Sequence, residues 1–85
     1  MSTVMTDEQT IKNIAENVAR LLEEKGMSQA ELARATKESE MNISRLVRGT
    51  NMPGAAMLSR VADALGVSVD YLISRHGGGP GKKSH

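Results

Sequence analysis

The sequence of 85 residues contains no cysteine, no tryptophan and no phenylalanine, and it has a single tyrosine. Without cysteine, neither a disulfide bond nor a thiolate metal site can stabilise the fold. The core must be built from Leu, Ile, Val, Ala and Met, which suits short, closely packed helices. No apolar run approaches the roughly 20 residues of a membrane span, and no secretory signal is visible. We therefore expect a cytoplasmic protein with one small core and no membrane contact.

The chain also has few residues suited to catalysis. Its two histidines, His76 and His85, lie in or beside a Gly-rich C-terminal segment, where they cannot hold a rigid acid–base or metal-binding geometry. Carboxylates are plentiful, but Glu16, Glu23 and Glu24 fall among the polar positions of an amphipathic helix. We therefore expect no catalytic set, no metal and no cofactor, and the sequence argues against an enzyme.

Apolar residues at helical spacing predict a first helix that ends at Gly26. Thr6 and Gln9 have the spacing of a capping box, and Asp7 and Glu8 suit a first helical turn. The apolar positions of this helix are Ile11, Ile14, Val18, Leu21 and Leu22.

The most specific pattern lies between residues 28 and 49, which read as two short helices joined by a tight turn. Ser28 and Glu31 form a capping box that opens the first of these helices. Ala33 is small enough to let the next helix approach closely. One face of the helix is predicted to carry Leu32, Ala33 and Thr36.

Ser39 is a good N-cap for the second helix of the pair, and Gly49 is a natural stop. Its buried stripe is predicted to consist of Ile43, Leu46 and Val47. Its outward residues are Glu40, Met41, Ser44, Arg45 and Arg48. This spacing is typical of a helix-turn-helix, in which one helix crosses the phosphate backbone of DNA and the second enters the major groove.

Two more helices are predicted in the second half of the chain. The fourth ends at Gly66, and Ser68 caps a short fifth helix with Tyr71 beside its apolar residues. Their apolar positions are Met57, Leu58, Val61, Ala62 and Leu65 in the fourth, and Val69, Leu72 and Ile73 in the fifth. No strand-like alternation occurs.

The motif resembles the Cro/C1-type repressor family of bacterial phages and plasmids. The resemblance covers roughly residues 14–73, and the segment ALGVSVDYL at 64–72 closely matches the end of lambdoid-phage repressor DNA-binding domains. Typical residue types fall in register without a gap at Ser28, Gln29, Leu32, Ala33, Ser39, Ile43, Ser44, Arg45, Arg48 and Gly49. The resemblance implies an all-α fold, a compact bundle of five short helices around a central helix-turn-helix.

Three positions depart from the family pattern. Lys37 stands where the family usually has a turn glycine, at a position that often needs φ > 0 and costs another residue about 1 kcal/mol. Glu38 replaces a small apolar residue that plugs the turn, and Val47 replaces a common glutamate. We therefore expect either a wider turn or a first motif helix that runs on through Lys37.

By family position, Glu40, Met41 and Arg45 face base edges. Arg45 can donate two hydrogen bonds to guanine, Glu40 can accept from cytosine N4, and Met41 can pack on a thymine methyl. Asn42 and Ser44 are further candidates for base or phosphate contacts. The alternative is that Glu40 and Arg45 are merely solvated helix residues and that Met41 is exposed without consequence.

Phosphate contacts are predicted for Ser28 and Gln29, because free N–H groups at a helix start favour an anion. Further candidates are Ser39, Arg48, Thr50 and Asn51. Alternatively, Asn51 only makes a turn and Arg48 pairs with a carboxylate.

The net charge is only +1, but it is unevenly distributed. Residues 1–40 carry five Lys or Arg and eight Asp or Glu, a net of −3, whereas residues 41–85 carry six and two, a net of +4. A positive face that meets DNA is therefore compatible with a nearly neutral molecule, although the split can also arise by chance.

The short fifth helix is predicted to bury Leu72 and Val69, which leaves Tyr71 and Ile73 partly outside. Similar repressors pair through this region, so the resemblance implies that Tyr71 and Ile73 form a two-fold dimer interface. The alternative is that Ile73 packs under the first helix and the protein pairs only on DNA.

These observations predict a flexible N-terminus at 1–6, a helix-turn-helix DNA-binding domain at 7–75 and a flexible Gly-rich tail at 76–85. The resemblance implies a sequence-specific transcriptional regulator of the phage- or plasmid-type repressor kind. It implies that this repressor binds a palindromic operator in double-stranded DNA as a homodimer. The alternative is an antitoxin-like module whose main partner is a toxin protein. Only short segments are left over to wrap a toxin, which argues against it.

Overall fold

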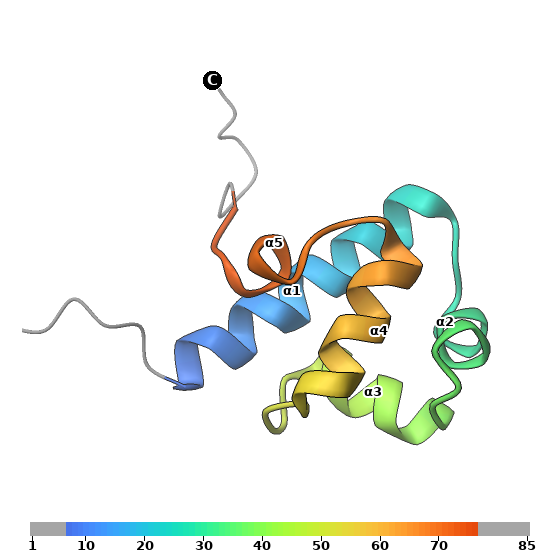
Figure 1. The fold of residues 1–85 in the computed structure, drawn as a ribbon, viewed down its shortest axis with the longest axis horizontal. Coiled ribbons are helices and arrows are strands. Elements are labelled where there is room, and N and C mark those ends of the chain that lie inside the picture. Colours follow the sequence, from blue (N-terminus) through green and yellow to red (C-terminus); the bar gives the residue numbers. More distant parts are fainter. Residues whose placement is uncertain (1–6, 77–85) are drawn as a thin grey trace, which may run out of the picture.

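The computed structural model describes residues 7–76, which form five α-helices (Figure 1). They are α1 (Asp7–Lys25), α2 (Gln29–Thr36), α3 (Glu40–Arg48), α4 (Ala55–Leu65) and α5 (Val69–Ile73). No strand occurs within this range. The predicted all-α bundle of five short helices is therefore confirmed. Apart from His76, the segments expected to be flexible lie outside the described residues, as does Thr6 of the predicted capping box.

The serines predicted as N-caps begin three of the helices. The Ser28 hydroxyl accepts from the Glu31 N–H at 3.0 Å, and the Glu31 carboxylate accepts from the Ser28 N–H at 2.8 Å, which completes the predicted capping box. Ser39 and Ser68 accept backbone N–H bonds in the same way at the starts of α3 and α5. These local bonds satisfy N–H groups that a helix start leaves without partners.

The turn between α2 and α3 is tight, as the motif predicted, and neither the wider turn nor the extension of α2 through Lys37 occurs. Helix α2 ends at Thr36, and Lys37 itself adopts the left-handed conformation, with φ of 61°. The Glu38 N–H then donates to the Ala33 carbonyl at 2.9 Å and closes the helix end. Packing around the turn therefore imposes a conformation that lysine disfavours by about 1–2 kcal/mol.

Replacing Lys37 by glycine should therefore stabilise the protein. We expect the free energy of unfolding to rise by up to about 1 kcal/mol, since relief of the left-handed strain is partly offset by the entropy of glycine in the unfolded chain. Denaturant titration measures the change. Lys12→Gly, in the middle of α1, is the control and should lose about 1 kcal/mol. Equal losses in both variants would contradict this account of the turn.

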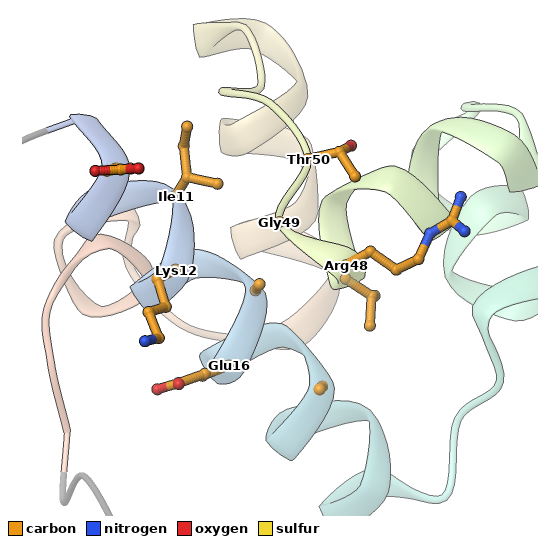
Figure 2. Close-up of a pocket in the computed structure, with 10 residues that line it drawn as sticks. Ile11, Lys12, Glu16, Arg48, Gly49 and Thr50 are labelled. Carbon is orange, nitrogen blue, oxygen red and sulfur yellow. The ribbon is translucent and has the colours of Figure 1, made fainter.

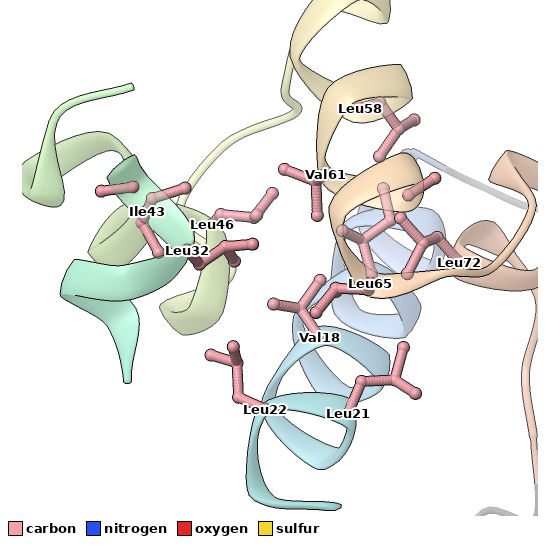
Figure 3. Close-up of a cluster of buried hydrophobic side chains, with 13 residues drawn as sticks. Val18, Leu21, Leu22, Leu32, Ile43, Leu46, Leu58, Val61, Leu65 and Leu72 are labelled. Carbon is pink, nitrogen blue, oxygen red and sulfur yellow. The ribbon is translucent and has the colours of Figure 1, made fainter. Parts of the chain in front are cut away.

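All five helices contribute to one apolar core (Figure 3). Ala33 is only 4% exposed, as its predicted place between α2 and α3 requires. Val47, predicted in the buried stripe of α3, is half-buried and packs against the edge of the core. None of the helices within residues 7–76 is long and apolar enough to cross a bilayer. The apolar side chains at most 1% exposed are Ile14, Val18, Leu32, Ile43, Val61, Leu65 and Leu72.

Helix α5 lies against α1 (Figure 1), and a buried amide of α1 holds its C-terminal end. Asn17 is 2% exposed, and its Nδ2 lies 2.7 Å from the Leu72 carbonyl, 2.7 Å from the Ser74 carbonyl and 3.2 Å from the Tyr71 carbonyl. The last carbonyls of a helix have no partner within it, and burial makes an unpaired one costly. The two N–H groups of the Asn17 amide supply donors to the Leu72 and Ser74 carbonyls, while the Tyr71 carbonyl also accepts from the Ser74 N–H at 3.3 Å.

Two neighbours of Asn17 extend this polar contact along α1. Asn13 Nδ2 donates to the Ile73 carbonyl at 3.1 Å, and Arg20 donates to the Tyr71 hydroxyl at 2.8 Å. The His76 ring stacks on the Tyr71 ring, with 3.9 Å between centroids. Tyr71 and Ile73 are half-buried, as predicted. Hydrogen bonds as well as apolar burial therefore fix α5 on the domain.

Leu72 is the inward residue of α5, as predicted, with no exposed surface. Its expected inward partner, Val69, is only half-buried. A helix of five residues has room for one fully buried side chain, so the prediction of an inward pair was wrong in this respect.

Candidate nucleic-acid interface

The exposed face of α3 presents the residues predicted to read bases. Met41 is 61% exposed, and Glu40 and Arg45 are also exposed. The opposite face is anchored by Ile43, which is fully buried, and by Leu46 at 4% exposure. Because one face of α3 is packed in the core, the exposed face is held in a fixed position and forms a rigid platform for its side chains.

Arg45 and Arg48 have no ion-pair partner within residues 7–76, where the only ion pairs are Arg20–Glu24 and Arg60–Glu38. The alternative in which Arg48 pairs with a carboxylate is therefore wrong for this part of the chain. Figure 2 shows the Arg48 side chain extending away from α1. Both cations lie in the last turn of α3, where the helix dipole stabilises them. They are available to an anion such as phosphate.

The start of α2 has fewer free donors than predicted. The Ser28 N–H and hydroxyl oxygen are both used by Glu31, whose carboxylate adds a negative charge at this helix end. Gln29 is exposed as the first residue of α2. A phosphate at this position would therefore meet Gln29 and the Ser28 hydroxyl hydrogen next to a carboxylate.

The other phosphate candidates lie at the two ends of α3. The Ser39 hydroxyl accepts from the Asn42 N–H at 3.1 Å and keeps its own hydrogen to donate. Thr50 donates to the Asn51 side-chain oxygen at 3.1 Å, and both residues are exposed. The structure thus places Ser39 beside the start of the platform, and Thr50 and Asn51 beside its end. Ser44 is half-buried on α3 itself.

Asn42 differs from the other predicted base-reading residues because its amide is already engaged. It is half-buried, and its Nδ2 donates to Glu38 Oε1 at 3.1 Å. Glu38 also accepts from Arg60 of α4, whose Nε donates to the Thr36 carbonyl at 3.0 Å. The sequence did not predict these contacts between Glu38, Asn42 and Arg60. The only sign of them was the unusual glutamate in the turn.

The hydrogen bond from Asn42, followed by that from Arg60, lowers the pKa of the Glu38 carboxyl. A carboxylate with a lowered pKa in the folded protein contributes stability above the pKa it has when unfolded. That contribution is lost as the pH falls through the lowered value. Glu38 therefore keeps its charge and its contacts under mildly acidic conditions.

A groove of about 580 Å³ runs between α1 and the C-terminal end of α3 (Figure 2). The two helices approach closely there, since a Cβ on Gly49 would lie 3.4 Å from the Ala15 Cβ. Ile11 and Val47 supply apolar lining, and Lys12 and Glu16 supply charges of opposite sign. Within residues 7–76 no group of three or more His, Asp or Glu side chains is placed to hold a metal ion.

The model of the helix-turn-helix family matches residues 18–72. The chain belongs to this family. It is 40% identical over 63 residues to the uncharacterized HTH-type transcriptional regulator y4dJ of Sinorhizobium fredii, a match that spans 74% of this chain and 82% of that protein. The fold matches the crystal structure of the hypothetical transcription factor NHTF from Neisseria, with a TM-score of 0.77 at 24% identity, over 89% of this chain and 85% of that one.

Within the helix-turn-helix family, α2 and α3 are the motif itself, and the class of function is DNA-binding regulation of transcription. The three departures from the family pattern leave this motif intact. Lys37 adopts the conformation of the usual glycine, Glu38 replaces an apolar plug by hydrogen bonds, and Val47 packs at the edge of the core. The helix-turn-helix geometry therefore tolerates each of them.

Proposed function

We propose that the protein is a sequence-specific repressor of the phage or plasmid type, which acts in the cytoplasm and binds a palindromic operator as a homodimer. The observation that supports this most directly is the exposed face of α3, where Met41 and Arg45 stand on a helix anchored by buried residues, and where Arg45 pairs with no carboxylate of residues 7–76. A helix of this kind fits the major groove of B-DNA.

Each exposed side chain of α3 has a chemistry that suits a different base. Arg45 donates two hydrogen bonds to guanine O6 and N7, and Met41 contacts a thymine methyl. Glu40 accepts from a cytosine N4 amine and repels bases that offer only acceptors, so it acts partly by rejecting wrong sequences. Ser44, half-buried on α3, donates to a base edge or a phosphate.

The phosphate contacts bracket this reading helix. Gln29 and Ser28 hold one phosphate at the start of α2, and Arg48, Thr50 and Ser39 hold others at the two ends of α3. The Thr50 hydroxyl donates to a phosphate by giving up the hydrogen bond that it makes to Asn51, which turns the chain at this point. These contacts fix the position of α3 in the groove, while α3 supplies the sequence preference.

The operator can be identified by selection from random DNA. The affinity of the protein for this operator should fall steeply as the salt concentration rises. Each phosphate neutralised by the protein contributes about −0.9 to the slope of log K against log salt concentration. Arg45 and Arg48, which form no ion pair in the part of the chain that the structure describes, support this expectation. Binding that does not depend on salt, or no selected sequence at low salt, would count decisively against the proposed function.

The dimer is proposed to form through α5, where Tyr71 and Ile73 are half-buried on a helix at the surface of the domain. A two-fold pair places two α3 helices in successive major grooves, about 34 Å apart. Each half-site alone offers few base pairs, so pairing doubles the contact with DNA.

A charge at Ile73 should therefore disrupt the dimer. We expect the wild-type protein to sediment as a dimer at micromolar concentration and Ile73→Asp to sediment as a monomer, because an unpaired carboxylate is costly in an apolar contact. Ala35→Asp, at an exposed position of α2, is the matched control and should leave the dimer intact. If wild type and Ile73→Asp sediment identically as dimers, the interface lies elsewhere.

A further inference from the structure

Glu38, in the turn between α2 and α3, joins α3 to α4 at the point where α3 begins. Its carboxylate accepts from Asn42 of α3 and from Arg60 of α4, and its side chain is only 14% exposed. Resting on the proposed function, we propose that Glu38 is a positioning residue that fixes the Asn42 amide so that it reads an adenine near the start of α3.

The chemistry of the pair sets the orientation of the amide. An ionised carboxylate only accepts hydrogen bonds, so Asn42 must face Glu38 with its nitrogen and not with its oxygen. One N–H and the carbonyl oxygen of the amide are then left for another partner. Adenine offers N7 as an acceptor and its N6 amine as a donor, which complement these two groups.

The support behind Glu38 is itself rigid. Arg60 holds the carboxylate and also donates to the Thr36 carbonyl at 3.0 Å. Thr36 is 1% exposed, and its hydroxyl donates to the Leu32 carbonyl at 2.8 Å. A side chain held in this way loses less conformational freedom when it binds a base, so the preference for the matching base increases.

Arg60 also makes the arrangement compatible with DNA. A lone carboxylate near the start of α3 would repel phosphates, whereas the ion pair with Arg60 compensates its charge. Glu38 can therefore act on Asn42 without weakening the approach of the whole domain to DNA.

The experiment measures base preference across the selected operator for full-length wild type, Asn42→Ala, Glu38→Met and the double variant. In wild type we expect one adenine per half-site to be preferred by about tenfold over other bases. Asn42→Ala and Glu38→Met should each reduce that preference to less than about threefold at this position only, and the double variant should lose no more. Glu23→Met, at an exposed glutamate of α1 that forms no ion pair with another described residue, is the matched control and should keep the wild-type preference.

Circular dichroism at the assay temperature confirms that each variant is folded. Glu38→Gln, which keeps an acceptor oxygen for Asn42, is the second variant and should retain the adenine preference within about threefold. A wild-type preference that survives Glu38→Met, or a loss spread evenly over all positions, would overturn the positioning role while leaving the proposed function standing. A wild-type protein that selects no operator would overturn both.

Discussion

Replacing Arg45 by alanine should weaken operator binding by about 1–3 kcal/mol and relax the preference at one base pair of each half-site. Arg45 is exposed on α3 and has no ion pair within residues 7–76, so its guanidinium is available for a bidentate contact with guanine. Its removal leaves the acceptors of that base facing water or an empty site. Titration of a panel of operator variants measures both the loss and its position.

The control for this prediction removes an equal charge elsewhere. Arg75→Ala, at an exposed position after α5, should change affinity little and to the same extent for every operator variant. The two variants separate base reading from general attraction to a polyanion, because only a base contact has a position in the sequence. If Arg45→Ala left the binding profile across operator variants unchanged, Arg45 would not read a base.

Much of the fold could be predicted because its signals are local. Ser28 and Glu31 are three residues apart, and their reciprocal hydrogen bonds depend on little beyond that spacing. Ser39 and Gly49 bound α3 for the same reason. The outward face of α3 follows from helical periodicity once Ile43 is placed inside.

The errors and omissions arise where distant residues decide the outcome. The prediction of a wider turn or a longer α2 failed at Lys37. The local cost of its left-handed conformation, about 1–2 kcal/mol, is smaller than the free energy that α2 and α3 gain by packing around a tight turn. Glu38 is paired with Arg60, 22 residues further along the chain, and no spacing rule connects them. Asn13 and Asn17 lie four residues apart on the apolar face of α1. This spacing was the sequence signal from which buried amides could have been predicted.

The same buried amides lead to a prediction about stability. Asn17→Ala should lower the free energy of unfolding by about 2 kcal/mol or more, because a buried carbonyl without a partner costs about 1–3 kcal/mol. The Leu72 and Ser74 carbonyls each lie 2.7 Å from Asn17 Nδ2, and both lose this donor in the variant. Denaturant titration measures the loss. Asn51→Ala, at an exposed loop position, is the control and should stay within about 0.5 kcal/mol of wild type.

The loss in Asn17→Ala should be concentrated at α5. With five residues this helix is too short to be stable alone, and Leu72 is its one fully buried side chain. Amide hydrogen exchange should therefore speed up in α5 well before it does in α3. If α5 carries the dimer contacts, Asn17→Ala should also weaken the dimer while leaving the helix-turn-helix folded. Uniformly faster exchange along the whole domain would show instead that Asn17 stabilises the core and has no special hold on α5.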